Sequence, residues 1–174
     1  MSTFSATANG GSTIGYAQYG SSSWSTGSGN GACQGAYQGT TAAKSRVGVM
    51  VFSGAGAALK GKLIQSITLT ITSSGAGSGS SGKVLTFHKA NYQSLNTGVR
   101  GSAQVGDTLG TLTGKFYSNT VTHTLNASSN AALFNAMKAY FEAGNAALVL
   151  YNGETSSSSG YSSNYAASPV AQFQ

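Results

Sequence analysis

The feature that most constrains the fold of this chain is a strict alternation of apolar and polar residues. In the segment IQSITLTIT, Ile67, Leu69 and Ile71 fall on one face of an extended chain, and the threonines between them fall on the other. Successive side chains of a β-strand point to opposite faces, and Ile and Thr both favour strands. The alternation therefore predicts a strand with one face in a core and the other in solvent.

The same period of two recurs along the chain. The segment SRVGVMVFS carries apolar or small residues on both faces, which predicts a strand that is covered on both sides. The segment KVLTFHKA places Leu85 and Phe87 inward and His88 outward. Further strands are predicted in DTLGTLTG, with a bulge at Gly110, and in NTVTHTLN, AALVLYN and VAQFQ, with TIGYAQY and GACQGAYQG as weaker candidates.

One segment has helical spacing instead. Its large apolar side chains follow one another at spacings of one, three and four residues; they are Leu133, Phe134, Met137 and Phe141. Ser129 can cap the start of a helix and Gly144 can end it. The segment predicts one short amphipathic helix, at about 129–143, that packs against a sheet with its methionine and aromatic residues in the core.

Many short strands, Gly-rich turns and a single helix predict an all-β fold, a two-sheet sandwich of the jelly-roll kind. We expect one domain over 1–174, with residues 1–44 as a more variable N-terminal region. Residues 73–82, SSGAGSGSSG, predict a flexible hairpin loop. The polar stretch after residue 152 predicts a surface loop, and Pro169 is expected to open the closing strand outside its hydrogen-bond ladder.

Charge is scarce, since 7% of residues are charged against about 25% in an average domain. The formal net charge is +6, but the nine basic residues are spread from Lys44 to Lys138 without a cluster. Phosphate binding needs a basic stripe with interleaved aromatic residues. We therefore expect no nucleic-acid partner.

The remaining sequence features concern targeting and metals. The N-terminus has neither a basic start nor an apolar run, so it does not read as a signal peptide, and no segment reaches the roughly 18 to 20 apolar residues of a membrane span. Cys33 is the single cysteine, so the chain forms no internal disulfide and no zinc site based on cysteine. We expect synthesis in a cytoplasm, no membrane partner, no metal and no cofactor.

Catalytic groups are few. Asp107, Glu142 and Glu154 are the only carboxylates, and a glycosidase needs two of them at roughly 5 to 10 Å across a sugar. Asp107 is expected in a turn and Glu142 at a helix end. His88 is expected in solvent and His123 in the core, and no GxSxG elbow marks a nucleophilic serine. We therefore expect a protein that is not an enzyme.

Four segments, in this order, resemble a known family: SRVGVMVF, LIQSITLTIT, AALVLYN and YSSNYAASPVAQF, which together reach from about residue 45 to the end. The chain resembles the carbohydrate-binding jelly rolls of the DNRLRE type and related sandwich domains of bacteriophage virion proteins. The resemblance implies sugar binding and a place in a virion. Members commonly carry an acidic residue before the closing proline, where this chain has Ser162, Ser163 and Asn164, so no metal site is carried over.

Sugar binding by stacking needs exposed aromatic faces among amides and hydroxyls. The candidates for glycan contact are Trp24, Tyr16, Tyr19 and Tyr37 near the N-terminus, and Tyr161 and Tyr165 near the C-terminus. Trp24 is the sole tryptophan and lies among residues that cannot bury it locally. The alternative for Trp24 is that it plugs one end of the sandwich or forms a subunit contact.

These features favour a non-enzymatic surface protein of a bacteriophage virion, either a capsid decoration or a component of a head or tail fibre, that adheres to host or environmental glycans. The expected partners are other virion proteins, a polysaccharide and further copies of the chain, in a trimer. The alternative is a carbohydrate-binding module of a secreted polysaccharide-degrading enzyme. A third class is structural self-assembly into a fibre or layer.

Overall fold

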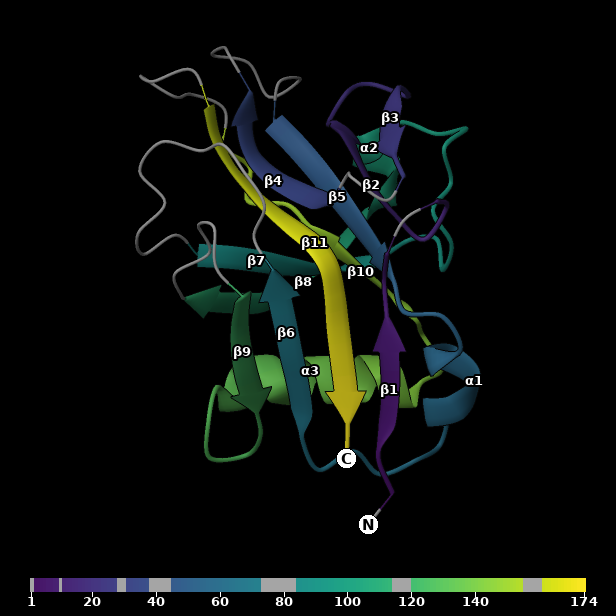
Figure 1. Cartoon of the computed structure of the whole chain (residues 1–174), viewed down its shortest axis with the longest axis vertical. Helices are drawn as coiled ribbons and strands as arrows, with labels where there is room; N and C mark the ends of the chain where they lie inside the picture. The colour runs from purple at the N-terminus through teal and green to yellow at the C-terminus, as the bar shows by residue number, and fades with distance from the viewer. Residues whose placement is uncertain are drawn as a thin grey trace.

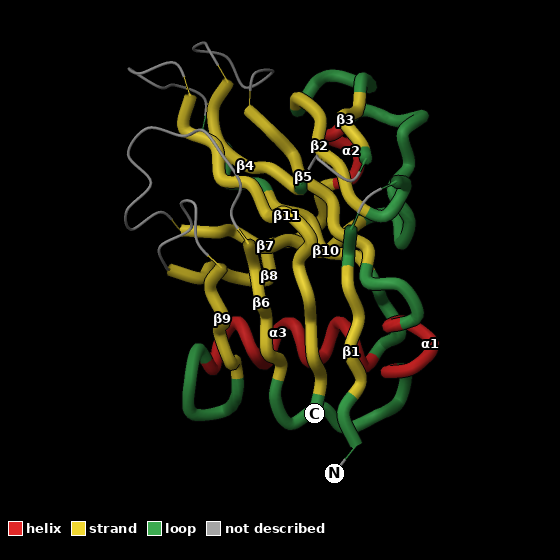
Figure 2. The backbone as a smooth tube through the Cα atoms, viewed as in Figure 1, coloured by secondary structure: helices red, strands yellow, loops and turns green. Residues whose placement is uncertain are grey.

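The computed structural model of the chain (Figure 1) describes residues 2–9, 11–27, 31–37, 45–72, 84–113, 120–154 and 161–174. Most of its regular structure is extended (Figure 2). The described strands are β1 (Phe4–Thr7), β2 (Ile14–Gln18), β3 (Trp24–Thr26), β4 (Ala32–Tyr37), β5 (Ser45–Val51), β6 (Ile67–Thr72), β7 (Val84–Ala90), β8 (Val105–Thr113), β9 (Thr120–Leu125), β10 (Ala147–Leu150) and β11 (Tyr161–Phe173). The described helices are α1 (Ala55–Leu59), α2 (Gly101–Gln104) and α3 (Ala131–Glu142).

The strands form two antiparallel sheets, which confirms the predicted all-β sandwich. Sheet A has the strand order β1-β11-β6-β9. Sheet B contains β8-β7-β10-β5, and β2 pairs with the opposite edge of β5 and carries β3 beyond it. Strand β4 pairs with the first residues of β5 and with β11. Residues 1–44 thus supply four strands, and these lie in both sheets.

Strand β11 belongs to both sheets. Its first half, Tyr161–Ala166, pairs with β4 in sheet B. From Ala167 it pairs with β6 in sheet A, with a register shift between Ala167 and Val170, and from Val170 it also pairs with β1. A strand that switches sheets through a bulge makes a corner of a sandwich. Pro169 lies at this shift, and its carbonyl accepts a hydrogen bond of 2.9 Å from the Ala8 amide.

The prediction for the C-terminal segment was therefore wrong in one respect. Residues 161–168 were expected to lie in a surface loop, with Pro169 at the start of the closing strand, but the strand begins at Tyr161 and Pro169 lies inside it. The stretch is rich in Ser and Asn, which are typical of loops. It becomes a strand because β4 supplies backbone partners, and composition does not reveal such a partner.

The alternating pattern of IQSITLTIT is confirmed in sheet A. Ile67, Leu69 and Ile71 are at most 2% exposed and face the core. The threonines of β6 face outward and pair by hydroxyl contacts of 2.9 to 3.1 Å with those of β9; the pairs are Thr68 with Thr124, Thr70 with Thr122 and Thr72 with Thr120. In sheet B, residues 45–50 of β5 are all buried, so the strand predicted to be covered on both sides is confirmed as well.

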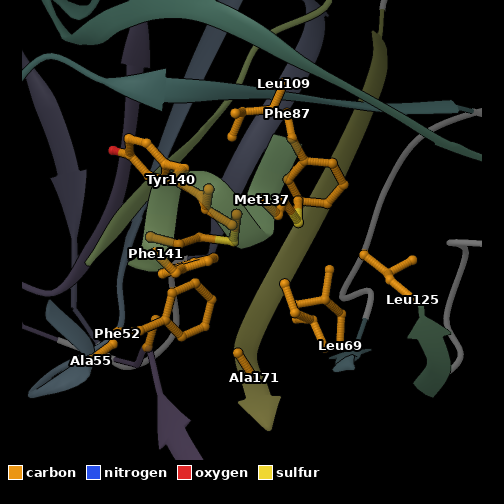
Figure 3. Packing of buried hydrophobic residues seen from close by; sticks show 14 of the residues in the cluster. Phe52, Ala55, Leu69, Phe87, Leu109, Leu125, Met137, Tyr140, Phe141 and Ala171 are labelled. Atoms are coloured by element: carbon orange, nitrogen blue, oxygen red, sulfur yellow. The ribbon is translucent and has the colours of Figure 1, made fainter. Parts of the chain in front are cut away.

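Helix α3 packs its apolar face into the space between sheet A and strands β7 and β8 (Figures 1 and 3). Phe141 is fully buried and meets Phe52 and Phe173 edge-on, with ring centroids 6.3 and 4.8 Å apart. The predicted helix is confirmed, with Gly144 ending it at φ +97°. Its start differs, because Asn130 rather than Ser129 occupies the cap position.

Two helices were not predicted. The sequence analysis expected a single helix, but α1 and α2 are also helical. Each is only four or five residues long and rich in Gly and Ala, so neither shows an apolar period. Helix α2 is held by tertiary bonds, since the amides of Gly101 and Ser102 donate to the carbonyls of Ser21 and Tyr19. The predicted loop at 73–82 lies outside the described residues.

Candidate ligand-binding groove

The predicted aromatic residues near the N-terminus do not form one platform. In the β2–β3 hairpin, Ala17 is the partner of Trp24, and Tyr16 is the partner of Ser25. Neighbouring pairs in a ladder point to opposite faces of a sheet. Trp24 and Tyr16 therefore lie on opposite faces of the hairpin, where a single sugar ring cannot reach both.

Trp24 is half-buried and has structural contacts. Its indole Nε1 donates a hydrogen bond of 2.9 Å to the carbonyl of Val99. Its ring packs on a second apolar cluster of sheet B that contains Val47 and Val149. Tyr19 packs on the same cluster and stacks on Tyr151 with ring centroids 5.0 Å apart. These contacts are those of a residue that closes one end of the sandwich, which is the alternative role that the sequence analysis gave to Trp24.

The structure describes fewer contacts for the other predicted aromatic residues. Tyr16 lies under the guanidinium group of Arg46, whose Cζ is 4.9 Å from the ring centroid. The backbones of Tyr37 and Tyr161 are directly opposite in the β4–β11 ladder, and Tyr165 is opposite Cys33. The side chains of Tyr37, Tyr161 and Tyr165 lie outside the described part of the structure.

The placement of His88 corrects a prediction. It was expected in solvent, but it is only 9% exposed. Its Nδ1 lies 3.0 Å from the Gly106 carbonyl and its Nε2 lies 2.9 Å from the Tyr151 carbonyl, so the ring bridges two segments. His88 does lie on the face of β7 opposite Leu85 and Phe87, but this second face is covered as well. Ala90, on the same face, belongs to the second apolar cluster, and the centroid of the Tyr151 ring is 5.8 Å from that of the imidazole. His123 is half-buried, and burial lowers its pKa below the ordinary value of 6.5.

The three carboxylates lie in separate sets of contacts. Asp107 forms an ion pair of 3.0 Å with Lys89. Glu142 pairs with Lys138 and accepts a hydrogen bond of 2.7 Å from the amide of Ile64. Burial raises the pKa of Glu142, but these two hydrogen bonds outweigh that effect and hold the pKa below its usual range.

Glu154, the third carboxylate, contacts the side chain of Asn152. Within the described ranges, no group of three or more His, Cys, Asp or Glu residues is placed to hold a metal ion.

A groove of about 840 Å³ lies between α3 and the paired strands β7 and β8. One wall is the helix, with Ala136, Ala139 and Ala143, and the other contains Lys89 and Asp107. The three alanines recur at spacings of three and four residues and so share one face of the helix. Because their side chains are short, the helix and the strands do not close on each other along this face.

Gly106 allows a close approach of neighbouring residues within the opposite wall. A Cβ atom at this position would lie 2.8 Å from the Lys89 carbonyl and 3.0 Å from Oδ1 of Asn91. Asn91 also lines the groove. Its Nδ2 donates to the carbonyls of Ala103 and Val105, so the oxygen of the amide is the atom that it can offer to a ligand.

The floor of the groove is held in place by Tyr140. Its hydroxyl donates to the Ala147 carbonyl at 2.8 Å and accepts hydrogen bonds of 3.0 Å from the Ala90 amide and from Nε2 of Gln93. Oε1 of Gln93 accepts in turn from the Ala146 amide at 2.7 Å. This network, in which Tyr140 is buried and Gln93 is exposed, holds the helix to the end of β7 and to the start of β10.

The polar groups on the strand wall are accessible. The side chains of Lys89 and Asp107 are 46% and 82% exposed, and Thr108 beside them is exposed. Tyr92, which lies in the chain between two residues of the wall, is 37% exposed. A donor, a carboxylate acceptor and an amide oxygen thus border a hollow floored by alanine and the Tyr140 ring. This arrangement suits a ligand that is rich in hydroxyl groups.

Sequence reasoning did not find this groove. Its residues come from β7, β8, the bend after β7 and α3, which are far apart in the chain. A signal was present in the alanine face of the helix and in Gly106, but each is ordinary by itself. Asp107 was considered as a catalytic group and as a turn former, whereas in the structure it belongs to a strand and pairs with Lys89.

Neither of the two sequence comparisons with known proteins supplies a relative. None of the helices in the described ranges has the length and apolarity to cross a membrane. No protein family model matches the chain, and the search of curated proteins returned no match.

Proposed function

We propose that this protein is a non-enzymatic glycan-binding protein on the surface of a bacteriophage virion. The observation that supports it best is the groove between α3 and β7–β8, where Lys89 and Asp107 face solvent above an alanine-lined wall. A pocket of this kind combines apolar lining with a few placed polar groups, within the usual range of about 300 to 1,000 Å³.

The chemistry of a saccharide fits these groups. Each sugar hydroxyl can donate and accept a hydrogen bond, and its ring has apolar C–H faces. Asp107 can accept from a hydroxyl while Lys89 donates to its neighbour, and the alanines and Tyr140 meet the apolar face of a ring. An exposed ion pair contributes only about 0.2 to 1 kcal/mol, so a ligand can open it at little cost.

The virion part of the proposal depends on the sequence. The resemblance to virion sandwich domains covers the chain from about residue 45 onward, and the surface is poor in charge. The resemblance is equally compatible with a carbohydrate-binding module of a secreted enzyme, so the two readings need separate experiments.

The groove is tested by filling it. Ala139 is an exposed residue of α3 that lines the groove, and Ala139→Trp places a large ring in the hollow. We expect the native chain to bind a neutral bacterial polysaccharide on a glycan array and Ala139→Trp to lose that binding. Ala127→Trp is the matched control, because Ala127 is exposed in the turn before α3 and does not line the groove. Binding that Ala139→Trp leaves unchanged would contradict the proposed site.

A second variant tests the chemistry rather than the shape. Asp107→Asn keeps the size of the side chain but removes the charge that strengthens a hydrogen bond from a hydroxyl. We expect affinity to fall about tenfold, as charged hydrogen bonds contribute roughly 1.5 to 3 kcal/mol. Asp107 is 82% exposed, so the variant should fold normally.

The virion location is tested by co-sedimentation. Purified protein mixed with phage particles or empty capsid shells should pellet with them, and antibody labelling should place it on their surface. If the protein binds polysaccharide but ignores particles, and its gene lies beside glycosidase modules, the carbohydrate-binding module is the better description. If it pellets with particles but binds no glycan, the adhesive role is wrong and the virion role stands.

A further inference from the structure

The edges of the two sheets differ in how well they are protected. Natural sheets avoid uncontrolled pairing by means of short strands, charges, prolines and bulges at their edges. Strand β3 is three residues long and β1 is four. Strand β8 contains Asp107 and has two register shifts against β7. Each of these edges carries a recognised protective feature.

Strand β9 has none of these features. Its six residues, TVTHTL, contain no proline, Lys, Arg, Asp or Glu, and its pairing with β6 runs from Thr120 to Leu125 without a shift. Among the described strands, β6 is its one partner. Figure 1 shows β9 at the outer side of sheet A. A regular, uncharged edge of this length is a template for another strand.

The side chains of β9 show which strand would fit. Thr120, Thr122 and Thr124 are exposed on the outer face, and Val121 and His123 on the inner face are only half-buried. A strand added at this edge would cover Val121 and His123 with its own inner side chains. It would also extend the paired threonine hydroxyls already present between β6 and β9.

We propose that the outer edge of β9, where the described part of the structure places no further strand, pairs antiparallel with β9 of a second copy of this chain, about a two-fold axis. In such a pair the sequence numbers of two opposite residues always add up to the same value. That value is even, because opposite residues lie on the same face of the sheet, and the residues on one face of β9 are either all even-numbered or all odd-numbered. Centring the axis on Thr122 places Thr120 opposite Thr124 of the other copy and Val121 opposite its His123. Every threonine then faces a threonine, so the strand is complementary to itself.

Charge is compatible with a second copy at this edge. Two copies with a formal net charge of +6 repel each other, but none of that charge lies in β9, so close approach is least unfavourable at this edge. One pair of short strands buries less area than the roughly 1,200 Å² of a specific stable interface. The dimer is therefore weak, and its population depends on protein concentration.

The test is the sedimentation velocity of the native chain and two variants over a wide range of concentrations. Thr122→Lys places two like charges opposite each other on the axis, and cross-strand like charges destabilise pairing. We expect its dissociation constant to rise at least about tenfold over that of the native chain. The matched control is Thr111→Lys, an exposed threonine on β8 that adds the same charge at another edge. It should dimerise like the native chain.

Charge complementation separates loss of pairing from loss of folding. Thr122→Glu should be as monomeric as Thr122→Lys, but an equimolar mixture of the two variants should regain a dimer because opposite charges then face each other. A native chain that stays monomeric at all concentrations would overturn the proposal. So would an oligomer, a trimer included, that Thr122→Lys does not weaken. Glycan binding by the groove is unaffected by either outcome.

Discussion

At the scale of single residues, Gly48 shows how one absent Cβ permits a crossing of strands. Gly48 lies in β5, and a Cβ atom built on it would be 2.2 Å from the amide nitrogen of Cys33 and 2.8 Å from the carbonyl carbon of Ala32. Both are backbone atoms of β4, which cannot move aside as a side chain can. In the sequence Gly48 is only a small residue in a strand, and its role follows from the neighbour that the fold brings to it.

We predict that Gly48→Ala destabilises the protein by about 3 kcal/mol or more, because the extra methyl group forces β4 away from β5. Urea denaturation of both proteins measures the difference. Gly61→Ala is the control, since Gly61 has open space around it and only a positive φ of +69°. Its expected cost is about 1 kcal/mol. Equal losses for the two variants would contradict the crowding argument.

His123 predicts how stability depends on pH. Burial lowers its pKa in the folded protein below the ordinary value of 6.5. As pH falls below 6.5, the unfolded chain binds a proton that the folded chain resists, so protonation favours unfolding. The contribution is fully present above pH 6.5 and is lost as pH falls through the pKa of the folded state.

We therefore expect the free energy of unfolding to decrease from pH 7.5 to pH 5.5, and His123→Gln to show a smaller decrease over the same range. Chemical denaturation at several pH values measures both slopes. A variant whose slope equals that of the native chain would show that His123 is not the group responsible.

At the scale of elements, the sequence was most informative where one period ran without interruption. The alternation of β6 and the spacing of α3 were enough to predict which side chains face the core, because burial imposes the period directly. Helices α1 and α2 were missed, and the loop predicted for residues 161–168 and the solvent exposure predicted for His88 were wrong. In each case the deciding partner lies in another element: β4 for β11, and the Ser21 and Tyr19 carbonyls for α2.

The candidate site follows the same rule at this scale. The aromatic residues chosen from the sequence were judged by type and local surroundings, which is why Trp24 was considered exposed to ligand. The groove depends on how α3 packs beside the β7–β8 ladder, with three short alanine side chains on the helix wall. No pattern within one segment of the sequence indicates which strand a helix will pack against.

At the scale of the whole molecule, β11 ties the two sheets together. Its first half pairs with β4 and its second half with β6 and β1, so either sheet loses an inner strand if the other unfolds. The two apolar clusters are also joined through β5, whose Met50 lies in one and whose Val49 lies in the other. Such shared strands make separate unfolding of the sheets costly.

We accordingly predict a single cooperative unfolding transition. Trp24 fluorescence reports on the β2–β3 end, while far-ultraviolet circular dichroism reports on all strands and α3. The two signals should give coincident curves in urea, as expected of one domain that unfolds in two states. A Trp24 transition at clearly lower urea would show instead that the N-terminal strands unfold independently of sheet A.

By itself the sequence determined the all-β class, the inward and outward faces of β6 and the amphipathic α3, because each depends on a local period that a single buried face imposes on its own residues. Only the tertiary structure decided that polar residues 161–168 form a strand, that β4 crosses β5 at Gly48, and that a groove opens beside α3. These features depend on contacts between segments distant in the chain, and hydrogen bonding and close packing between such segments leave no periodic trace in either one.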